Sequence, residues 1–563
     1  DAGHVRVFKV RPTFSSAATS TDGTKVVLTY DEALSATTAA TTAFTVRSGG
    51  AVNTVNGVAI NGSTVELTVA NVIKQGQAVH VSYIDPTSNN DNNAVQNAGG
   101  TDAATLKTAD VNNQSTVAAN PTLGFSIQQI GSNKLEGSAK HDQFGYSVST
   151  SRDGKILAVG AIEVNQSKGY VQVYEQIGNS WQLLGNKIVG DKNKERFGGQ
   201  LSLSADGTRL VVGANRNHDA GNQAGTARIY ELNNTRTQWI AISPELDGSN
   251  AKARAGEAVA ISGDGNTVAI GMPQHKNRVS TSNPGNVAVY KYNAITGAWA
   301  LHKINTADSP DGIDKREKEH FGSSLALSYD GNTIIIGAPR FDNPASNYSS
   351  MIAEGRAAIY DFTEGVGYRK VDDVRGQAFH GALVGSAVAI SDDGKTIVVG
   401  GPFSKSNQTR KEKTGVTYVY QRDNNNNYQP IAKPIWGNNF EDRAGAVSIS
   451  GDGKRVARAV RGHDEHRKSN IGRVEIYEYR GGKHWTLIGS QLGEDKGDNA
   501  GWGKTSIALS RDGSRLVLAS RLNDNVAKNS GHVRVFDINN NGPAILTETV
   551  NISESRPSGF TVK

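Results

Sequence analysis

The sequence contains no cysteine, and this absence excludes disulfide bonds, cysteine-ligated metal sites and thiol catalysis. It also contains no run of about 18 apolar residues, so it predicts no membrane-spanning helix. Neither sign of charge is in large excess, because 60 Lys and Arg face 54 Asp and Glu. A net charge of +6 over 563 residues lacks the dense basic stripe of a nucleic-acid-binding protein. We therefore expect no nucleic acid partner and no membrane insertion.

Glycine, in contrast, is abundant, at 63 positions, and Asn, Ser and Thr are frequent. This composition is typical of soluble all-β proteins rich in turns. A chain of 563 residues predicts two or more domains. We expect an extracellular or cell-surface protein of a bacterium. The chain begins at Asp1 without a methionine, so we expect a processed form or a piece of a longer protein.

One phrase recurs seven times from about residue 137 onward. Each copy has two apolar-alternating stretches around an Asp-Gly pair, which predicts a two-residue hairpin turn with φ > 0 at both positions. A third strand such as "GYVQVY" and a fourth, often with Trp, follow each turn. The turns are Asp153-Gly154, Asp206-Gly207, Asp264-Gly265, Asp330-Gly331, Asp393-Gly394, Asp452-Gly453 and Asp512-Gly513. Four antiparallel strands repeated seven times predict a seven-bladed β-propeller.

The seventh copy lacks a fourth strand, whereas a matching stretch, residues 124–136, precedes the first copy. We predict that this stretch forms the outer strand of the seventh blade, because such closure removes an exposed sheet edge. The predicted propeller spans residues 124–554. Residues 555–563 are predicted to be a C-terminal linker or tail.

The repeat resembles the FG-GAP propeller repeats of integrin heads and bacterial surface proteins. The resemblance depends on Phe144-Gly145, Phe197-Gly198 and Phe321-Gly322, each followed by "VGA"- and "GxVxVY"-like strands. Calcium-binding members of that family have several carboxylates in the hairpin, whereas only the last Asp is present here. Because Ca²⁺ takes six to eight oxygen ligands, the turns are predicted to be structural.

Residues 11–108 differ from the repeats in being rich in Thr, Ala and Asn and free of Trp. The alternating stretches "TKVVLTY", "AFTV", "STVELTVA" and "QAVHVSYI" predict an Ig-like β-sandwich. Together with "LTYDEALSA" and "VNGVAINGSTVELTVA", they resemble the SwmB-type repeat of bacterial surface proteins, which implies a spacer or adhesion module. Residues 109–123 are predicted to be a linker.

The loop 85–102 carries Asp85, Asp91 and Asp102 among Asn and Gln residues. One interpretation is a calcium site, because oxygen ligands gather there. The other is a polar loop stabilised by Asx turns. The sequence gives no indication of any other cofactor.

The six residues Gly3–Phe8 recur letter for letter as Gly531–Phe536, the predicted third strand of the seventh blade. Residues 1–10 are therefore interpreted as an N-terminal strand or arm. The arm either derives from a preceding propeller of a tandem array or pairs with the sheet edge of a neighbouring molecule. Chance recurrence, or a first strand of the sandwich, are the remaining interpretations. The residues of the predicted polymer contact are Gly3, His4, Val5, Arg6, Val7 and Phe8.

Propeller topology predicts that the long loops between second and third strands share one face with the connections between blades. This face is predicted to bind an acidic polysaccharide or a carboxylate-bearing neighbour, because Arg forks suit such groups. A solvated rim is the alternative, since Asp and Glu are interleaved. A metal at His463 and His466 is disfavoured, because a loop holds ligands in fixed geometry poorly. The predicted residues are Arg216, His218, His275, Lys276, Arg278, Lys405, Arg410, Lys411, Arg461, His463, His466 and Arg467.

The sequence has no H-E-x-x-H, G-x-S-x-G or Walker pattern, so we expect a protein that is not an enzyme. The expected function is structural or adhesive, as a repeating unit of a bacterial cell-surface adhesin or filament. Its partners would be copies of itself or neighbouring repeats of a longer chain. The alternative is a secreted lectin-like binder of acidic glycans through the basic face. A propeller glycoside hydrolase or lyase is a third interpretation.

Overall fold

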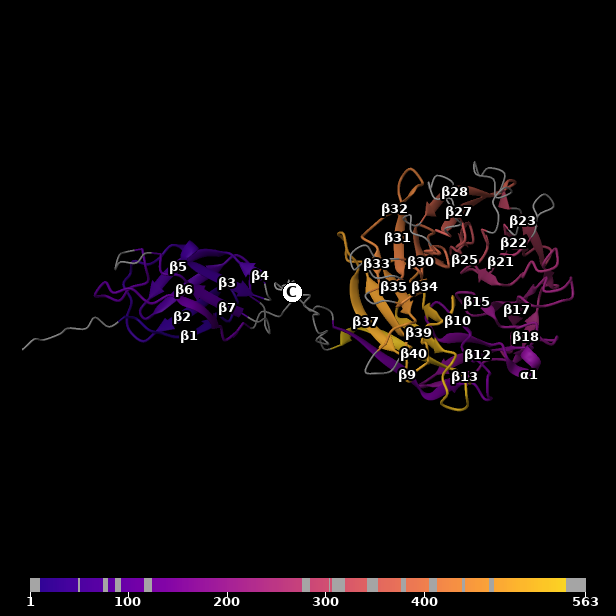
Figure 1. Ribbon diagram of the computed structural model, residues 1–563, viewed down its shortest axis with the longest axis horizontal. Helices are drawn as coiled ribbons and strands as arrows, with labels where there is room; N and C mark the ends of the chain where they lie inside the picture. The colour runs from indigo at the N-terminus through magenta and orange to yellow at the C-terminus, as the bar shows by residue number, and fades with distance from the viewer. Residues whose placement is uncertain are drawn as a thin grey trace, which may run out of the picture. The chain divides into compact units, whose positions relative to one another are not determined.

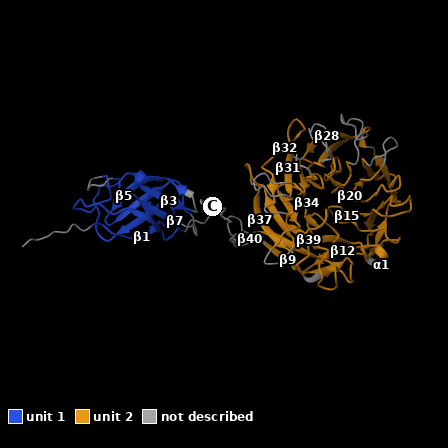
Figure 2. Cartoon of the chain, in the orientation of Figure 1, with its two compact units in different colours: residues 1–124, 541–563 blue, residues 125–540 orange. Residues whose placement is uncertain are grey.

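The computed structural model describes residues 11–48, 51–73, 79–86, 93–115, 124–275, 284–302, 304–305, 319–341, 353–375, 381–404, 413–437, 441–464 and 470–542. Regular structure in these residues is β-strand, apart from one 3-10 turn, η1 (Thr41–Ala43), and one helical turn, α1 (Val164–Ser167). The all-β prediction is therefore confirmed. The chain divides into two compact units, residues 1–124 with 541–563 and residues 125–540 (Figure 2).

Unit 1 contains two four-stranded antiparallel sheets that share one apolar core. The first sheet runs β1 (Phe14–Thr19), β2 (Lys25–Tyr30), β6 (Thr64–Val69) and β5 (Val55–Asn61). The second runs β4 (Ala51–Asn53), β3 (Phe44–Ser48), β7 (Val79–Tyr83) and β8 (Leu106–Asp110). Buried residues alternate along β2 and β7, so each sheet turns one face to the core.

Unit 2 contains seven sheets that repeat one strand order. The first runs β10 (Ser147–Thr150), β11 (Ile156–Ala161), β12 (Tyr170–Ile177) and β13 (Ser180–Leu183), with β14 (Ile188–Val189) on β12. The second runs β15 (Gln200–Leu203), β16 (Arg209–Ala214), β17 (Thr226–Leu232) and β18 (Trp239–Ala241), with β19 (Leu246–Asp247) on β17. The third runs β20 (Ala258–Ile261), β21 (Thr267–Met272), β22 (Asn286–Asn293) and β23 (Ala298–His302).

The remaining sheets keep this order. The fourth runs β25 (Ser324–Leu327), β26 (Thr333–Ala338), β27 (Arg356–Thr363) and β28 (Gly367–Arg375), with β24 (Ile304–Asn305) on β28. The fifth runs β29 (Ala387–Ile390), β30 (Thr396–Gly401), β31 (Val416–Arg422) and β32 (Tyr428–Pro430), with β33 (Ile435–Trp436) on β31. The sixth runs β34 (Ala444–Ile449), β35 (Arg455–Val460), β36 (Arg473–Glu478) and β37 (Thr486–Leu492). The seventh runs β38 (Ile507–Leu509), β39 (Arg515–Ser520), β40 (His532–Gly542) and β9 (Gly124–Glu136).

The first strands of these sheets contact one another in cyclic order, from β10 through β38 and back to β10. Residues from all seven first strands line a central channel of about 190 Å³. Figure 1 shows β10, β15, β25 and β34 near the middle of unit 2, and β13, β18, β28, β32 and β37 towards its rim. We call this arrangement of seven sheets the ring.

Backbone hydrogen bonds between neighbouring Asp-Gly turns join all seven sheets on one face, which we call the turn face. In each link, the turn Asp or the residue before it donates its N–H to the residue before the next turn Asp, over 2.6–3.0 Å. The acceptors in order around the ring are Ala205, Gly263, Tyr329, Asp392, Gly451, Arg511 and Arg152. The last link returns to the first turn, so this series of hydrogen bonds is circular.

Strand β9 precedes the first sheet in the chain but lies beside β40 as the outermost strand of the seventh sheet. The prediction that residues 124–136 pair with the last sheet is therefore confirmed. Buried Leu135 of β9 packs in one cluster with Val533 of the seventh sheet and Val148 of the first. The segment thus contributes to the contact between the first and last sheets.

Apolar clusters fill all seven interfaces between neighbouring sheets. Phe144, Phe197 and Phe321 lie in three of them and are at most 1% exposed. A glycine in the second strand permits close approach of the next sheet, because a Cβ on Gly160 would lie 2.1 Å from the Gly198 carbonyl oxygen. The repeated "FG" and "VGA" patterns are therefore requirements of sheet-to-sheet packing.

The Asp-Gly turns differ from the predicted two-residue hairpin. The Gly154 N–H donates to the Ser151 carbonyl at 3.1 Å, and the Asp153 carboxylate accepts from Ser151 Oγ at 2.8 Å and from the Lys155 N–H at 3.0 Å. The Ser-to-Asp bond recurs in all seven described turns. Gly154 has a φ of 68°, whereas none of these seven Asp residues has a positive φ. The flanking strands do form antiparallel hairpins, as β10 and β11 do. The prediction of a two-residue turn is wrong, because the Ser and Asp side chains stabilise a longer loop in which only the glycine is left-handed.

Candidate functional site: a cationic cavity of the ring

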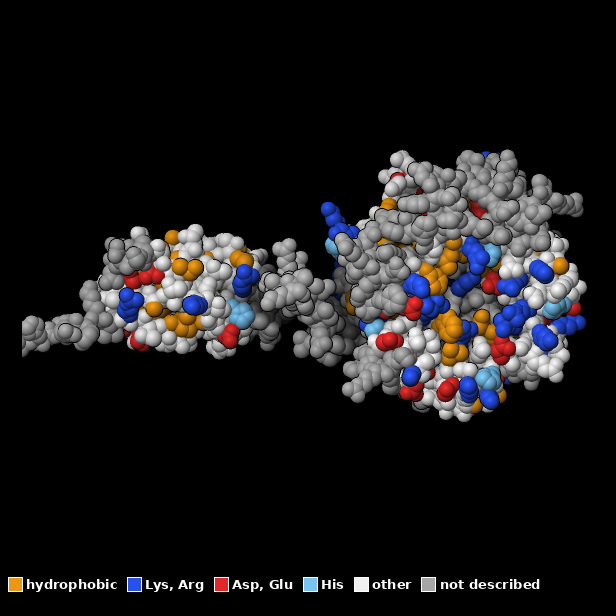
Figure 3. Space-filling model, in the orientation of Figure 1, with side chains coloured by type: hydrophobic (Ala, Val, Ile, Leu, Met, Phe, Trp, Pro, Cys, Tyr) orange, Lys and Arg blue, Asp and Glu red, His pale blue; other side chains and the backbone are white. Residues whose placement is uncertain are grey.

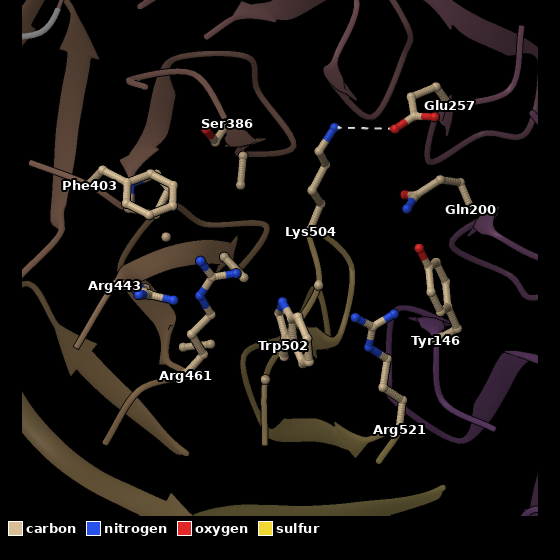
Figure 4. A pocket seen from close by; sticks show the side chains of 17 residues that line it. Tyr146, Gln200, Glu257, Ser386, Phe403, Arg443, Arg461, Trp502, Lys504 and Arg521 are labelled. Atoms are coloured by element: carbon tan, nitrogen blue, oxygen red, sulfur yellow. Dashed lines mark ion pairs between the residues drawn. The ribbon is translucent and has the colours of Figure 1, made fainter. Parts of the chain in front are cut away.

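A cavity of about 310 Å³ opens where the first strands of the ring begin, at their end away from the turn face (Figure 4). Most of its lining belongs to the fifth, sixth, seventh and first sheets and their connections. Besides small residues, the lining has three kinds of side chain. They are the cations Arg443, Arg461, Arg521 and Lys504, the aromatics Tyr146, Phe403 and Trp502, and the polar residues Gln200, Glu257 and Ser386.

Arginines and aromatic rings lie side by side along this lining. Trp502 lies between Arg461 and Arg521, Tyr146 lies on the other side of Arg521, and Phe403 is within cation–π distance of both Arg443 and Arg461 (Figure 4). The Arg521 guanidinium carbon lies 4.4 Å from the Trp502 ring centroid and 4.6 Å from that of Tyr146. The Arg461 guanidinium carbon lies 5.9 Å from Trp502 and 5.6 Å from Phe403. These are cation–π distances, so the rings hold the guanidinium groups in place. We call this set the arginine–aromatic stack.

Positive charge in the cavity is only partly balanced. Arg443 pairs with Glu441 at 3.2 Å, whereas Arg461 and Arg521 have no ion pair with any residue in the described ranges. Burial lowers the pKa of Arg461, and the neighbouring charges of Arg443 and Arg521 lower it further. Burial also lowers the pKa of Arg521. Both groups remain cationic near neutral pH, because the ordinary pKa of arginine is so high.

Lys504 lies between the cavity and the central channel, and its side chain lines both. Its Nζ donates to the Ser323 carbonyl at 2.7 Å and lies 4.0 Å from Glu257 Oε1. Burial lowers the pKa of Lys504, while Glu257 opposes that shift. Glu257 also accepts a hydrogen bond from Asn215. Figure 4 shows the ion pair of Lys504 with Glu257 on the side of the cavity away from Arg461.

The cavity forms where the sequence departs from the repeat. Arg461 and Arg521 follow the second strands β35 and β39, at the position that proline occupies after β21, β26 and β30. Four residues, 502–505, separate Gly501 from Ser506, whereas one residue separates Gly145 from Ser147 in the first copy. The three extra residues allow this segment to place both Trp502 and Lys504 in the cavity lining. A comparison of the seven copies position by position would have identified these departures.

Of the twelve residues predicted to line a basic face, the structure describes Arg216, His218, His275, Arg461 and His463. Arg461 lines the cavity. Burial lowers the pKa of Arg216, and the neighbouring charges of Arg196 and Arg254 lower it further. Figure 3 shows Lys and Arg side chains around the middle of unit 2. The predicted residues outside the described ranges are Lys276, Arg278, Lys405, Arg410, Lys411, His466 and Arg467.

The three described histidines do not line the cavity. His218 Nδ1 accepts from the Gln223 N–H at 3.3 Å. His275 Nδ1 lies 3.1 Å from Ser249 Oγ, and burial lowers the His275 pKa. The side chain of His463 is buried. None of these three histidines therefore lines the cavity with Arg461. The sequence reasoning missed Arg443, Arg521, Trp502 and Lys504.

The residues of the suggested calcium site lie in unit 1. The Asp102 carboxylate is buried and accepts from Gln96 Nε2 at 3.0 Å. The Asp85 N–H donates to Thr105 Oγ1 at 3.1 Å. Asp91 lies outside the described residues. Among the residues that the structure describes, no group of three or more His, Asp or Glu side chains is arranged to hold a metal ion.

The second copy of the repeated hexapeptide lies within the described residues, in the seventh sheet. His532 to Phe536 belong to β40, which lies between β39 and β9 in the seventh sheet. The side chain of Arg534 lies 3.7 Å from Glu494 Oε1, and that of His532 is buried. Residues Gly3, His4, Val5, Arg6, Val7 and Phe8 lie outside the described ranges.

A family model described as "Putative flagellar system-associated repeat" matches residues 8–88. The match covers β1 to β7 of unit 1 and supports the resemblance of this region to the SwmB-type repeat. No curated protein matches the chain. No helix in the described part of the chain has the length and apolar character needed to traverse a membrane.

Proposed function

We propose that this protein is a surface-associated adhesion protein that binds its partner through the cavity of the ring. Unit 1 acts as a spacer of the SwmB type, built as a β-sandwich. The ring acts as a seven-bladed β-propeller of the FG-GAP type. The observation that carries the proposal is the cavity, because it gathers three arginines and leaves two of them without an ion pair among the described residues. Such a site favours an anionic partner.

The difference between the two ends of the ring favours a structural turn face and a binding site at the other end. The turn face repeats one hydrogen-bonded loop seven times and links the loops in a circle, which makes a rigid base. The cavity lies at the other end of the first strands, on connections that differ from copy to copy. Binding sites commonly lie on variable loops that a rigid scaffold positions. The description of the family matched by residues 8–88 favours a surface or flagellar location.

Immunogold electron microscopy of the source cells tests the location. Antibodies raised against residues 11–108 should label the cell surface, a surface filament or the flagellum. A second antibody, against an abundant cytoplasmic enzyme, provides the matched control for access to the cell interior. Labelling confined to the interior, together with the cytoplasmic control, would contradict the proposal. The proposed protein has no enzymatic activity of its own. A screen for release of sugar from glycoside substrates tests this expectation, because turnover of a substrate would contradict it.

Self-assembly is a second candidate function, favoured by the hexapeptide that recurs in β40. In the ring, this strand lies between strands on both sides, so the same six residues are compatible with β pairing. We propose that residues 3–8 can add to a sheet edge of a neighbouring copy. Filaments in negatively stained native material should then shorten or disappear in a Val5→Pro variant, because proline removes a backbone donor. A monomer by sedimentation at high concentration would contradict this candidate.

A further inference from the structure

Guanidinium groups of the cavity lie against aromatic rings. Trp502 lies between Arg461 and Arg521 (Figure 4), so its ring faces are not available as platforms for a neutral sugar. A guanidinium that stacks on a ring keeps its N–H donors in its own plane, where they match the two oxygens of an oxyanion.

Three arginines elsewhere in the ring have carboxylates supplied by the chain. Arg356 pairs with Glu319 at 2.9 Å, and Arg458 pairs with Glu475 at 2.7 Å. Stacking does not replace such a partner, because Arg209 stacks on Tyr292 and still pairs with Glu231 at 2.8 Å. Arg461 and Arg521 differ from these three arginines, because neither has an ion pair within the residues that the structure describes. The half-buried Arg216 and Arg254 also have none among these residues, but Arg461 and Arg521 line one cavity. Their counter-ion is therefore expected to come from a ligand in that cavity.

The opposite wall offers groups that suit hydroxyls. Gln200 has an amide, Ser386 a hydroxyl and Glu257 a carboxylate that Asn215 and Lys504 orient. Figure 4 shows Glu257, Gln200 and Lys504 on one side of the cavity and Arg461 and Arg521 on the other. A ligand that satisfies both walls carries an oxyanion at one end and several hydroxyl groups at the other.

The size of the cavity limits the ligand further. Its volume of about 310 Å³ is near the lower end of the range for small-molecule sites, roughly 300–1,000 Å³. A folded protein segment needs a longer groove, whereas a sugar unit at the end of a chain fits a compact site. The combination of size, cationic wall and hydroxyl-binding wall favours an acidic sugar over an acidic peptide.

We infer that the cavity binds an acidic sugar unit, with its carboxylate or sulfate group against Arg461 and Arg521 and its hydroxyls against Gln200, Glu257 and Ser386. This inference deepens the proposed function and rests on it, because it names the partner that the adhesion protein recognises. Carboxylate and sulfate share the chemistry that two guanidinium edges recognise. The ligand is thus an oxyanion-bearing glycan, and the experiment separates the two oxyanions.

Isothermal titration calorimetry of the full chain tests the inference with four probes. They are a galacturonate tetramer, a galactose tetramer, a sulfated galactose tetramer and a tetraglutamate peptide. At least one acidic tetramer should bind, and the neutral tetramer should bind at least about tenfold more weakly. Preference for the sulfated over the carboxylated tetramer would support the inference and identify sulfate as the source. Equal binding of the neutral tetramer, or of tetraglutamate, would overturn it.

Variants locate the binding. Arg461→Gln and Arg521→Gln should each weaken binding of the acidic tetramer about tenfold to a hundredfold, because each removes a charge-assisted donor. Gln200→Ala should weaken the acidic tetramer more than free sulfate, since it changes the hydroxyl-binding wall. Arg236→Gln is the matched control, because Arg236 is exposed and pairs with Glu175 outside the cavity. Unchanged binding by Arg461→Gln and Arg521→Gln, with thermal unfolding preserved, would overturn the inference. The labelling of cells tests the surface location independently of these binding experiments. Failure of the inference and failure of the proposed function are therefore distinguishable.

Discussion

The two faces of the ring treat arginine in opposite ways. On the turn face, Arg152 and Arg511 both pair with the carboxylate of Asp392, and the Arg152 Nη2 lies 2.5 Å from Asp392 Oδ2. In the cavity, Arg461 and Arg521 stack on aromatic rings, and no ion pair holds either within the described part of the chain. In the first arrangement the protein itself neutralises both arginines, whereas the second leaves their charge without a partner among the described residues. The difference supports the proposal that the turn face is structural and that the cavity binds an anionic partner.

The difference also follows the repeat. The turn face is built from the same Ser, Asp and Gly in all seven copies, because every sheet needs the same loop. The cavity uses residues that occur in only one or two copies, such as Arg461 and Trp502. Regular positions therefore determine the ring, and irregular positions determine the site. The predictions below vary the partner of an arginine in each setting.

The largest effect is expected where a fully buried arginine loses its carboxylate. Glu475 and Arg458 are at most 2% exposed, and the Tyr477 hydroxyl also donates to Glu475 at 2.8 Å. Glu475→Gln should lower the free energy of unfolding by roughly 3–5 kcal/mol, because it leaves a buried cation without a counter-ion. Urea denaturation measures the change. Glu478→Gln is the control, since Glu478 is 19% exposed and its partners Arg455 and Arg480 are more exposed than Arg458, so the loss should be smaller. Equal losses in both variants would contradict the prediction.

The same carboxylate predicts a pH dependence. Burial alone would raise the pKa of Glu475, but Arg458 and Arg473 outweigh it and lower the pKa from 4.5 to about 2. Between these values the unfolded chain binds a proton that the folded chain does not, so stability falls as the pH drops from about 4.5 to about 2. The urea midpoint should fall across this window. The fall should be smaller in Glu475→Gln, and an identical slope in both proteins would exclude Glu475 as its source.

An intermediate effect is expected on the turn face. Asp392→Asn removes the charge shared by Arg152 and Arg511, but Arg152 is 54% exposed, so water compensates in part. We expect a loss of roughly 1–2 kcal/mol in the free energy of unfolding. The control is Glu175→Gln, which breaks the surface pair with Arg236 and should cost about 0.5 kcal/mol or less. No loss in Asp392→Asn would mean that the backbone hydrogen bonds alone stabilise this face.

Much of the fold could be predicted from the sequence, because strand alternation and the Asp-Gly turns are local signals. The all-β class and the pairing of residues 124–136 with the last sheet are confirmed. In unit 1, β2, β3, β6 and β7 lie in the predicted alternating stretches, whereas β1, β4, β5 and β8 do not. The prediction of the turn geometry was wrong, because residue propensities do not indicate the Ser-to-Asp hydrogen bond.

The site was harder to predict, because its members are distant in sequence. Tyr146 and Arg521 are 375 positions apart, and only the circular arrangement of the sheets brings both to the cavity. Arg461 was among the predicted residues because it precedes a long loop, and not because it departs from the repeat. Arg521 and Trp502 also depart from the repeat. Charge balance around Arg461 depends on three-dimensional neighbours, so no linear pattern indicates it.

The smallest effect has the opposite sign and therefore separates the two faces most clearly. Arg461→Gln removes two cation–π contacts, each about 0.5–1 kcal/mol at such sites. It also removes the repulsion from Arg443 and Arg521, which is larger at the effective dielectric of a half-buried site. We expect the unliganded variant to be more stable by roughly 1 kcal/mol.

Arg458→Gln is the matched control, and its stability should fall because Glu475 loses its partner. Thermal unfolding in low and high salt measures the stability of both variants. Added salt should make the stability gain of Arg461→Gln smaller, because screening already weakens the repulsion between the arginines of the wild-type chain. A loss of stability in Arg461→Gln would show that the cavity arginines are structural, as those of the turn face are.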